Sequence, residues 1–207
     1  MKMPYRDSRP GTRNPHSSLR GGRQQQETGD YALYTTIPIR DAPYPHGLGK
    51  LDHEKLEFSM RRLLGARWQD QAANEAAFWT APYQELLEKY LKPFFDREGD
   101  IVDAARQATE VGRRNLLLGQ RLFHDVDPDP RSRYWDAWPD ADATGELARV
   151  VRSLVVWPLQ FTKYSDGNTS YANGRHRMSY LRSRIQRQDP EFEVLVRIDY
   201  VDHPKHG

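Results

Sequence analysis

One stretch of the sequence, residues 170–182, joins a predicted strand to a predicted helix through a single glycine, Gly174. The three residues after that glycine, Arg175, His176 and Arg177, can all bear positive charge. The first turn of a helix leaves backbone N–H groups without intrahelical partners, and the helix dipole adds partial positive charge there. Because glycine lets a ligand approach the backbone closely, we expect an anion such as phosphate to bind at this turn, with the three side chains as donors.

Composition narrows the class of protein without identifying it. A chain of 207 residues can bury a substantial core, and its net charge of +2 does not by itself indicate nucleic-acid binding. Cysteine is absent, which excludes thiol nucleophiles, cysteine metal sites and disulfides. No apolar run reaches the length of a membrane span, and the N-terminus lacks the apolar segment of a signal peptide. We therefore expect a cytoplasmic protein with no membrane partner.

The N-terminal part is predicted to consist of a tail and a helical extension. Residues 1–30 carry six basic and three acidic residues with almost nothing that packs, so we expect a flexible basic tail. The strand-like residues 31–39 contain Pro38, which restricts them to a sheet edge or a strand end. The prolines and glycines of residues 43–49 mark a loop. Helical periodicity then recurs up to residue 118, so residues 31–118 are predicted to form a mainly helical extension, with helices over 51–64, 68–79, 82–95 and 100–118, the last of them capped by Asp100.

The C-terminal part, residues 119–207, has the pattern of a small α+β domain. A helix is predicted over 145–154, a strand over 155–162, a hairpin turn over 165–168 and a second strand over 169–172. The helix after Gly174 follows, and residues 192–200 alternate as a last strand that closes the sheet. The acidic loop 124–130 does not fit an EF-hand, because Pro130 occupies the position that requires glycine.

This order of elements resembles the ParB/sulfiredoxin superfamily over roughly the C-terminal two-fifths of the chain. The residues that carry the resemblance are Asp129-Pro130-Arg131, Glu146-Leu147-Ala148, Val155 to Leu159, Asp166-Gly167 and Gly174-Arg175-His176-Arg177. Members bind a nucleotide, and they include CTP-hydrolysing ParB proteins, ATP-using sulfiredoxins, free-serine kinases and nucleases. The resemblance implies a small mixed sheet with helices, and a bound nucleotide, ATP or CTP, with Mg²⁺.

Site residues follow from the resemblance position by position. Asn173, Gly174, Arg175, His176 and Arg177 correspond to the phosphate clamp, and Arg131 or Arg133 to an arginine near the same pocket. Catalysis also needs an acid to hold a metal or orient a nucleophile, and Asp166, Glu146, Asp129 and Asp136 are candidates, with His176 as a further catalytic candidate. His176 is equally suited to a structural role, in which its ring hydrogen-bonds a backbone carbonyl.

Three departures limit the family's activities. Arg175 stands where sulfiredoxins have their catalytic cysteine, which excludes sulfinic-acid reduction. Asn173 stands where the serine kinases have an acid, and an amide cannot act as a base. The chain stops soon after its last predicted strand, where ParB proteins continue into a helix-turn-helix domain, so we do not expect recognition of partition sites.

We rank nucleotide hydrolysis or phosphoryl transfer first and keep two alternatives. Nucleic-acid binding or ParB-like nuclease activity on DNA or RNA is suggested by interleaved arginines and tyrosines, namely Arg175, Arg177, Arg182, Arg184 and Arg187 with Tyr171 and Tyr180. A catalytically inactive interaction module, with a protein partner bound by the N-terminal helices, is the other. A pocket filled by Trp135, Trp138 or Trp157 would favour the module.

Overall fold

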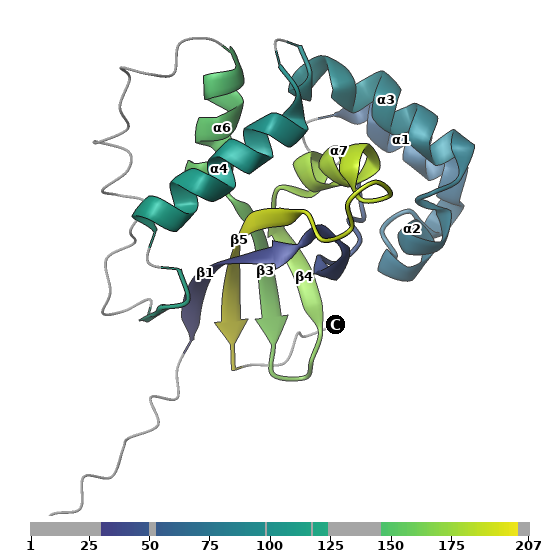
Figure 1. The fold of residues 1–207 in the computed structure, drawn as a ribbon. Helices are drawn as coiled ribbons and strands as arrows, with labels where there is room; N and C mark the ends of the chain where they lie inside the picture. The colour runs from purple at the N-terminus through teal and green to yellow at the C-terminus, as the bar shows by residue number, and fades with distance from the viewer. Residues whose placement is uncertain (1–29, 50–52, 98, 117, 124–145, 203–207) are drawn as a thin grey trace, which may run out of the picture.

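The structure of the chain is a computed structural model, and it describes residues 30–49, 53–97, 99–116, 118–123 and 146–202. The predictions of a tail before residue 30 and of a turn over 124–130 lie outside these residues. Within them the protein is α+β, with helices gathered above a five-stranded mixed sheet in the view of Figure 1. The α+β class predicted from the sequence is therefore confirmed.

The sheet joins strands from both ends of the described chain. Its order is β2-β1-β5-β3-β4, in which β3 and β5 are parallel and the other neighbours are antiparallel. The strands are β1 (Tyr31–Pro38), β2 (Arg121–Phe123), β3 (Leu159–Tyr164), β4 (Thr169–Asn173) and β5 (Glu193–Val201). Pro38 is the last residue of β1, which agrees with its predicted place at a strand end.

The helices between β1 and β2 fill most of the predicted extension. They are α1 (Glu54–Leu64), α2 (Gln71–Ala77), α3 (Ala81–Phe95) and α4 (Ile101–Asn115), with short 3-10 turns η1 (Ile39–Asp41) and η2 (Gly65–Arg67). Asp100 caps α4 as predicted, because its side chain accepts a hydrogen bond from the Val102 N–H. The predicted helix 68–79 is shorter, since η2 and the cap residue Asp70 precede α2.

The junction between α6 and β3 differs most from the prediction in the C-terminal part. Helix α6 (Glu146–Val156) includes Val155 and Val156, which the sequence assigned to a strand. Val151, Leu154 and Val155 are buried at helical spacing, so the β-branched run continues the apolar face of the helix. Pro158 then disfavours helical geometry for the residue before it, and β3 begins at Leu159. Helix α7 (Arg175–Ile185) follows Gly174, as predicted.

Strand β5 does not close the sheet but lies in its middle, between β1 and β3. Its residues from Val194 to Asp199 are buried on both faces. The apparent alternation in the sequence comes from Arg197 and Asp199, which share one face and pair with each other, Nε to Oδ1 at 2.8 Å. Ion pairing lets a charged pattern occupy a central strand.

The predicted boundary between residues 118 and 119 runs through a shared sheet and a shared core. Strand β1 pairs with β5 along its whole length, from Tyr31 opposite Tyr200 to Pro38 opposite Glu193. One cluster of buried side chains includes Leu56 and Leu91 from the helices before the boundary and Met178 and Val196 from after it. The helical segment thus packs directly on the α+β part.

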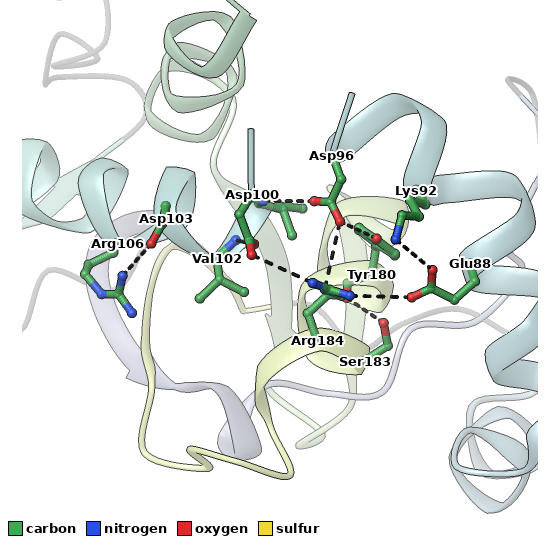
Figure 2. Close-up of polar contacts among 11 residues, drawn as sticks. Glu88, Lys92, Asp96, Asp100, Val102, Asp103, Arg106, Tyr180, Ser183 and Arg184 are labelled. Atoms are coloured by element: carbon green, nitrogen blue, oxygen red, sulfur yellow. Dashed lines mark hydrogen bonds and ion pairs between the residues drawn. The ribbon is translucent and has the colours of Figure 1, made fainter. Parts of the chain in front are cut away.

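A polar network fixes α7 against α3 and the start of α4 (Figure 2). The Tyr180 hydroxyl donates to Asp96 Oδ2 at 2.5 Å, and the other oxygen of Asp96 accepts from the Ile101 N–H at 3.0 Å. Arg184 lies 3.8–3.9 Å from carboxylate oxygens of three acids, Glu88, Asp96 and Asp100.

None of the helices in the described ranges is both long and apolar enough to cross a membrane.

Candidate functional site

The glycine turn is built as the sequence predicts. Gly174 has φ +84° and ψ 12°, the left-handed conformation, and it is the N-cap of α7 with no side chain capping the helix. A Cβ at this position would lie 2.7 Å from Leu159 Cδ2 and 3.2 Å from Leu159 Cα. An irregular register between β3 and β4, next to Gln160, lies beside the turn and re-aims the chain. Only glycine fits both the conformation and the space.

Each basic side chain of the turn makes a hydrogen bond to backbone. Arg175 Nη1 donates to the His46 carbonyl at 3.4 Å, and Arg177 Nη1 donates to the Ser153 carbonyl in α6 at 2.6 Å. His176 Nε2 accepts from the Gly49 N–H at 2.8 Å, so this ring nitrogen bonds to a backbone donor and not to the carbonyl that was expected. The turn is thus enclosed by α6 on one side and by residues 46–49 on another.

Arg177 is a cation with no carboxylate in contact among the described residues. Burial lowers the pKa of its guanidinium to about 10, so the group remains protonated near neutral pH. Its second terminal nitrogen, Nη2, lies 3.5 Å from the place where a Gly174 Cβ would be. The first turn of α7 contains no acidic residue. A buried charge without a counter-ion is unfavourable, so an anion at the turn would be stabilised here.

The loop that contacts the turn was predicted only as a loop. Gly47 and Gly49 both have positive φ, and the Gly47 N–H donates to the Trp68 carbonyl at 3.2 Å. A Cβ on Gly49 would lie 2.1 Å from the Glu57 backbone nitrogen, so the loop packs tightly on the start of α1. The two glycines were the available signal for such packing, but the contact between Gly49 and His176 joins residues far apart in the sequence and no local pattern indicates it.

Asp166 is the one candidate acid whose side chain the structure describes, and it does not lie at the glycine turn. Asp166 lies in the β3–β4 turn, where its Oδ1 accepts from the Asn168 N–H at 2.8 Å. The five residues of β4 separate that turn from Gly174, a span of roughly 13–16 Å at the usual rise of a strand. Asn173 ends β4 and is partly buried beside Gly174. Glu146 begins α6, but its side chain is not among those described; Asp129, Arg131, Arg133 and Asp136 also lie outside the described residues.

Both tyrosines proposed for base stacking, and one of the five arginines, are interior. Tyr171 and Tyr180 are buried, and the Tyr171 hydroxyl donates to the Pro43 carbonyl at 2.6 Å. Arg182 is fully buried; its Nη2 donates to the Ile39 and Ala42 carbonyls, and its guanidinium lies 4.0 Å over the Tyr44 ring. These three side chains therefore hold the fold together and are unavailable to bases.

Two further features were missed by sequence reasoning. Asp199 accepts from Gln160 Nε2 at 2.5 Å as well as from Arg197, which makes a buried polar cluster beside the start of β3. A hollow of about 240 Å³ lies between α4 and residues 189–193, with Arg106, Arg113, Phe192 and Glu193 in its lining. None of the lining residues belongs to the glycine turn or to residues 46–49.

One of the three tryptophans considered as filling a pocket is described, and no metal cluster is found among the described residues. Trp157 is 50% exposed, so it does not fill a pocket, while Trp135 and Trp138 lie outside the described ranges. Within those ranges no group of three His, Asp or Glu side chains is arranged to hold a metal ion.

No family model, no curated protein and no solved structure matches this chain. The fold class is given by the structure itself, and the relationship to ParB and sulfiredoxin stays a prediction from the residues quoted above.

Proposed function

We propose that this protein binds the phosphate groups of a nucleotide at the turn from Gly174 to Arg177, in a domain of ParB/sulfiredoxin type. The observation that carries the proposal is Arg177, a partly buried cation beside a left-handed glycine at a helix N-terminus, with no carboxylate partner among the described residues. Backbone N–H groups at the helix start, with a guanidinium nitrogen 3.5 Å from where a Gly174 Cβ would lie, are the donors that would bind a multiply charged anion.

The order of elements supports the domain type. Helix α6, the β3–β4 hairpin, the glycine turn, α7 and β5 follow one another as the resemblance requires. The turn lies at the end of β4 and against Leu159, the first residue of β3. Strand β5 then runs parallel to β3. This arrangement brings α6 beside the turn, because its Ser153 carbonyl accepts from Arg177.

We rank hydrolysis or phosphoryl transfer above simple binding, because such reactions depend mainly on positioning and charge stabilisation. Arg177 and the first-turn amides would hold the phosphates in place. Glu146 is the acid we favour, since it begins the same helix that contacts Arg177. ATP or CTP with Mg²⁺ is the proposed ligand, and the cation would neutralise phosphate charge when bound. Asp166 is not favoured at its distance along β4.

The test is thermal unfolding of the full chain with ATP, CTP, GTP and tripolyphosphate, each with and without Mg²⁺. A ligand that binds only the folded state raises the midpoint of unfolding. The informative variant is Arg177→Met, which keeps similar volume but removes the charge; Arg187→Ala is its control, because that arginine is exposed and lies over the Trp79 ring.

We expect Arg177→Met to weaken nucleotide binding roughly 10- to 150-fold, which corresponds to about 1.5–3 kcal/mol for a charge-assisted hydrogen bond. The free energy of unfolding without ligand should change by about 1 kcal/mol or less, since relief of the buried charge offsets the lost bond to Ser153. Failure of every ligand to raise the midpoint of the unmodified protein would refute the proposal. Unfolding of Arg177→Met would show that the arginine is structural.

A further inference from the structure

We infer that the aromatic rings of His53 and Phe94 form the wall against which the base of the nucleotide packs. The inference rests on the proposed function and adds a ligand class to it: a nucleotide with an aromatic base, in preference to a bare polyphosphate. Both residues belong to the helical segment before β2, which the sequence resemblance does not cover. That segment would then contribute directly to the ligand site.

The rings form a continuous path away from the phosphate turn. The ring centroids of His176 and His53 are 4.7 Å apart, and those of His53 and Phe94 are also 4.7 Å apart. Both contacts are edge-to-face, at 75° and 83°. Two successive ring contacts therefore lead from His176, in the first turn of α7, to Phe94. The ribose of a nucleotide can span the distance between a phosphate at the turn and a base on Phe94.

Phe94 is exposed, whereas the other large apolar side chains of α3 are buried or partly buried. Its exposed fraction is 53%, whereas Leu87 and Leu91 of the same helix are fully buried. Core packing does not account for this ring, which closes α3 one residue before its end. An exposed aromatic face beside a cationic turn matches the two parts of a nucleotide, because bases stack on aromatic side chains irrespective of their sequence.

His53 adds polar groups to the same wall. It is partly buried at the N-cap position of α1, and its side chain makes no capping hydrogen bond there. Its contacts within the described residues are with rings, so its ring nitrogens are available to donate to or accept from a base edge. The nearby acid Glu57 is paired with Arg61 at 2.7 Å, so its charge is compensated.

The experiment compares dissociation constants for ATP, CTP, GTP and tripolyphosphate, measured by calorimetry on the full chain. Phe94→Ala removes the proposed wall, and Phe58→Ala is the matched control, since Phe58 of α1 is 70% exposed. We expect Phe94→Ala to weaken the best-bound nucleotide roughly 5- to 150-fold and to change tripolyphosphate binding less than twofold. Phe58→Ala should change neither, and Arg177→Met should weaken both.

The outcomes separate this inference from the proposed function. If the unmodified protein binds tripolyphosphate and nucleotides, but Phe94→Ala changes neither constant, the wall is refuted and phosphate binding stands. If the protein binds none of the four ligands, the proposed function fails and the wall with it. Phe94→Leu retains apolar volume without a ring, and it must reproduce the selective loss even if Phe94→Ala proves unstable.

Discussion

Replacing Gly174 with alanine tests how the turn is built. The residue has φ +84°, where an L-amino acid costs about 1–2 kcal/mol. The added Cβ would also lie 2.7 Å from Leu159 Cδ2 and 3.2 Å from Leu159 Cα, and Leu159 is buried and cannot rotate away freely. Overpacking of this kind costs about 1–3 kcal/mol. We therefore expect Gly174→Ala to lower the free energy of unfolding by roughly 2–5 kcal/mol.

The matched control is Gly167→Ala in the β3–β4 turn. Gly167 has nearly the same φ, +83°, but a Cβ there would meet no atom within 4 Å. Only the conformational cost applies, so we expect a loss of about 1–2 kcal/mol. Urea unfolding of both variants gives the two losses, which can be compared directly if the unfolding free energy depends on urea concentration with the same slope in both. Equal losses in the two variants would refute the reasoning, because the contact with Leu159 would then contribute nothing.

Two further predictions concern the residues that hold α7 in place. Arg182→Ala should lower the free energy of unfolding by about 3–5 kcal/mol, because it leaves a cavity and deprives the Ile39 and Ala42 carbonyls of their donor; a urea midpoint close to that of the unmodified protein would contradict this. Tyr180→Phe should cost about 1.5–3 kcal/mol at neutral pH through loss of the bond to Asp96. Burial, and then that bond, raise the pKa of Tyr180. The stability that the hydroxyl contributes is therefore complete below pH about 10 and is lost as pH rises further. The difference in free energy of unfolding between the two proteins should narrow in alkaline solution, and a constant difference would contradict this assignment.

Local features of the fold were predictable where nearby residues determine the backbone. Gly174 between a strand pattern and a helix pattern fixed the start of α7, and Asp166-Gly167 gave the hairpin turn, with Gly167 at positive φ. Asp100 was recognised as a cap because a short acceptor side chain before a helical pattern has that role. These assignments needed no information about distant parts of the chain.

The rest depended on pairing over long sequence separations. The central position of β5 follows from its pairing with β1, more than 150 residues earlier, which no local pattern encodes. The burial of Arg182 was unpredictable for the same reason, since its acceptors are the Ile39 and Ala42 carbonyls. Arginine side chains are usually exposed, but one can be buried where backbone carbonyl oxygens from distant parts of the chain accept its hydrogen bonds.

Binding at the glycine turn is tested most directly by an NMR titration of the ¹⁵N-labelled full chain with ATP and CTP in the presence of Mg²⁺. We predict that the largest amide shift changes fall on Arg175, His176 and Arg177, with a smaller change at Gly49, whose N–H is bonded to His176. In Arg177→Met the same nucleotide concentrations should give much smaller changes. The account would be contradicted if millimolar nucleotide left these amides unchanged, or if the largest changes fell instead on the hollow between α4 and residues 189–193.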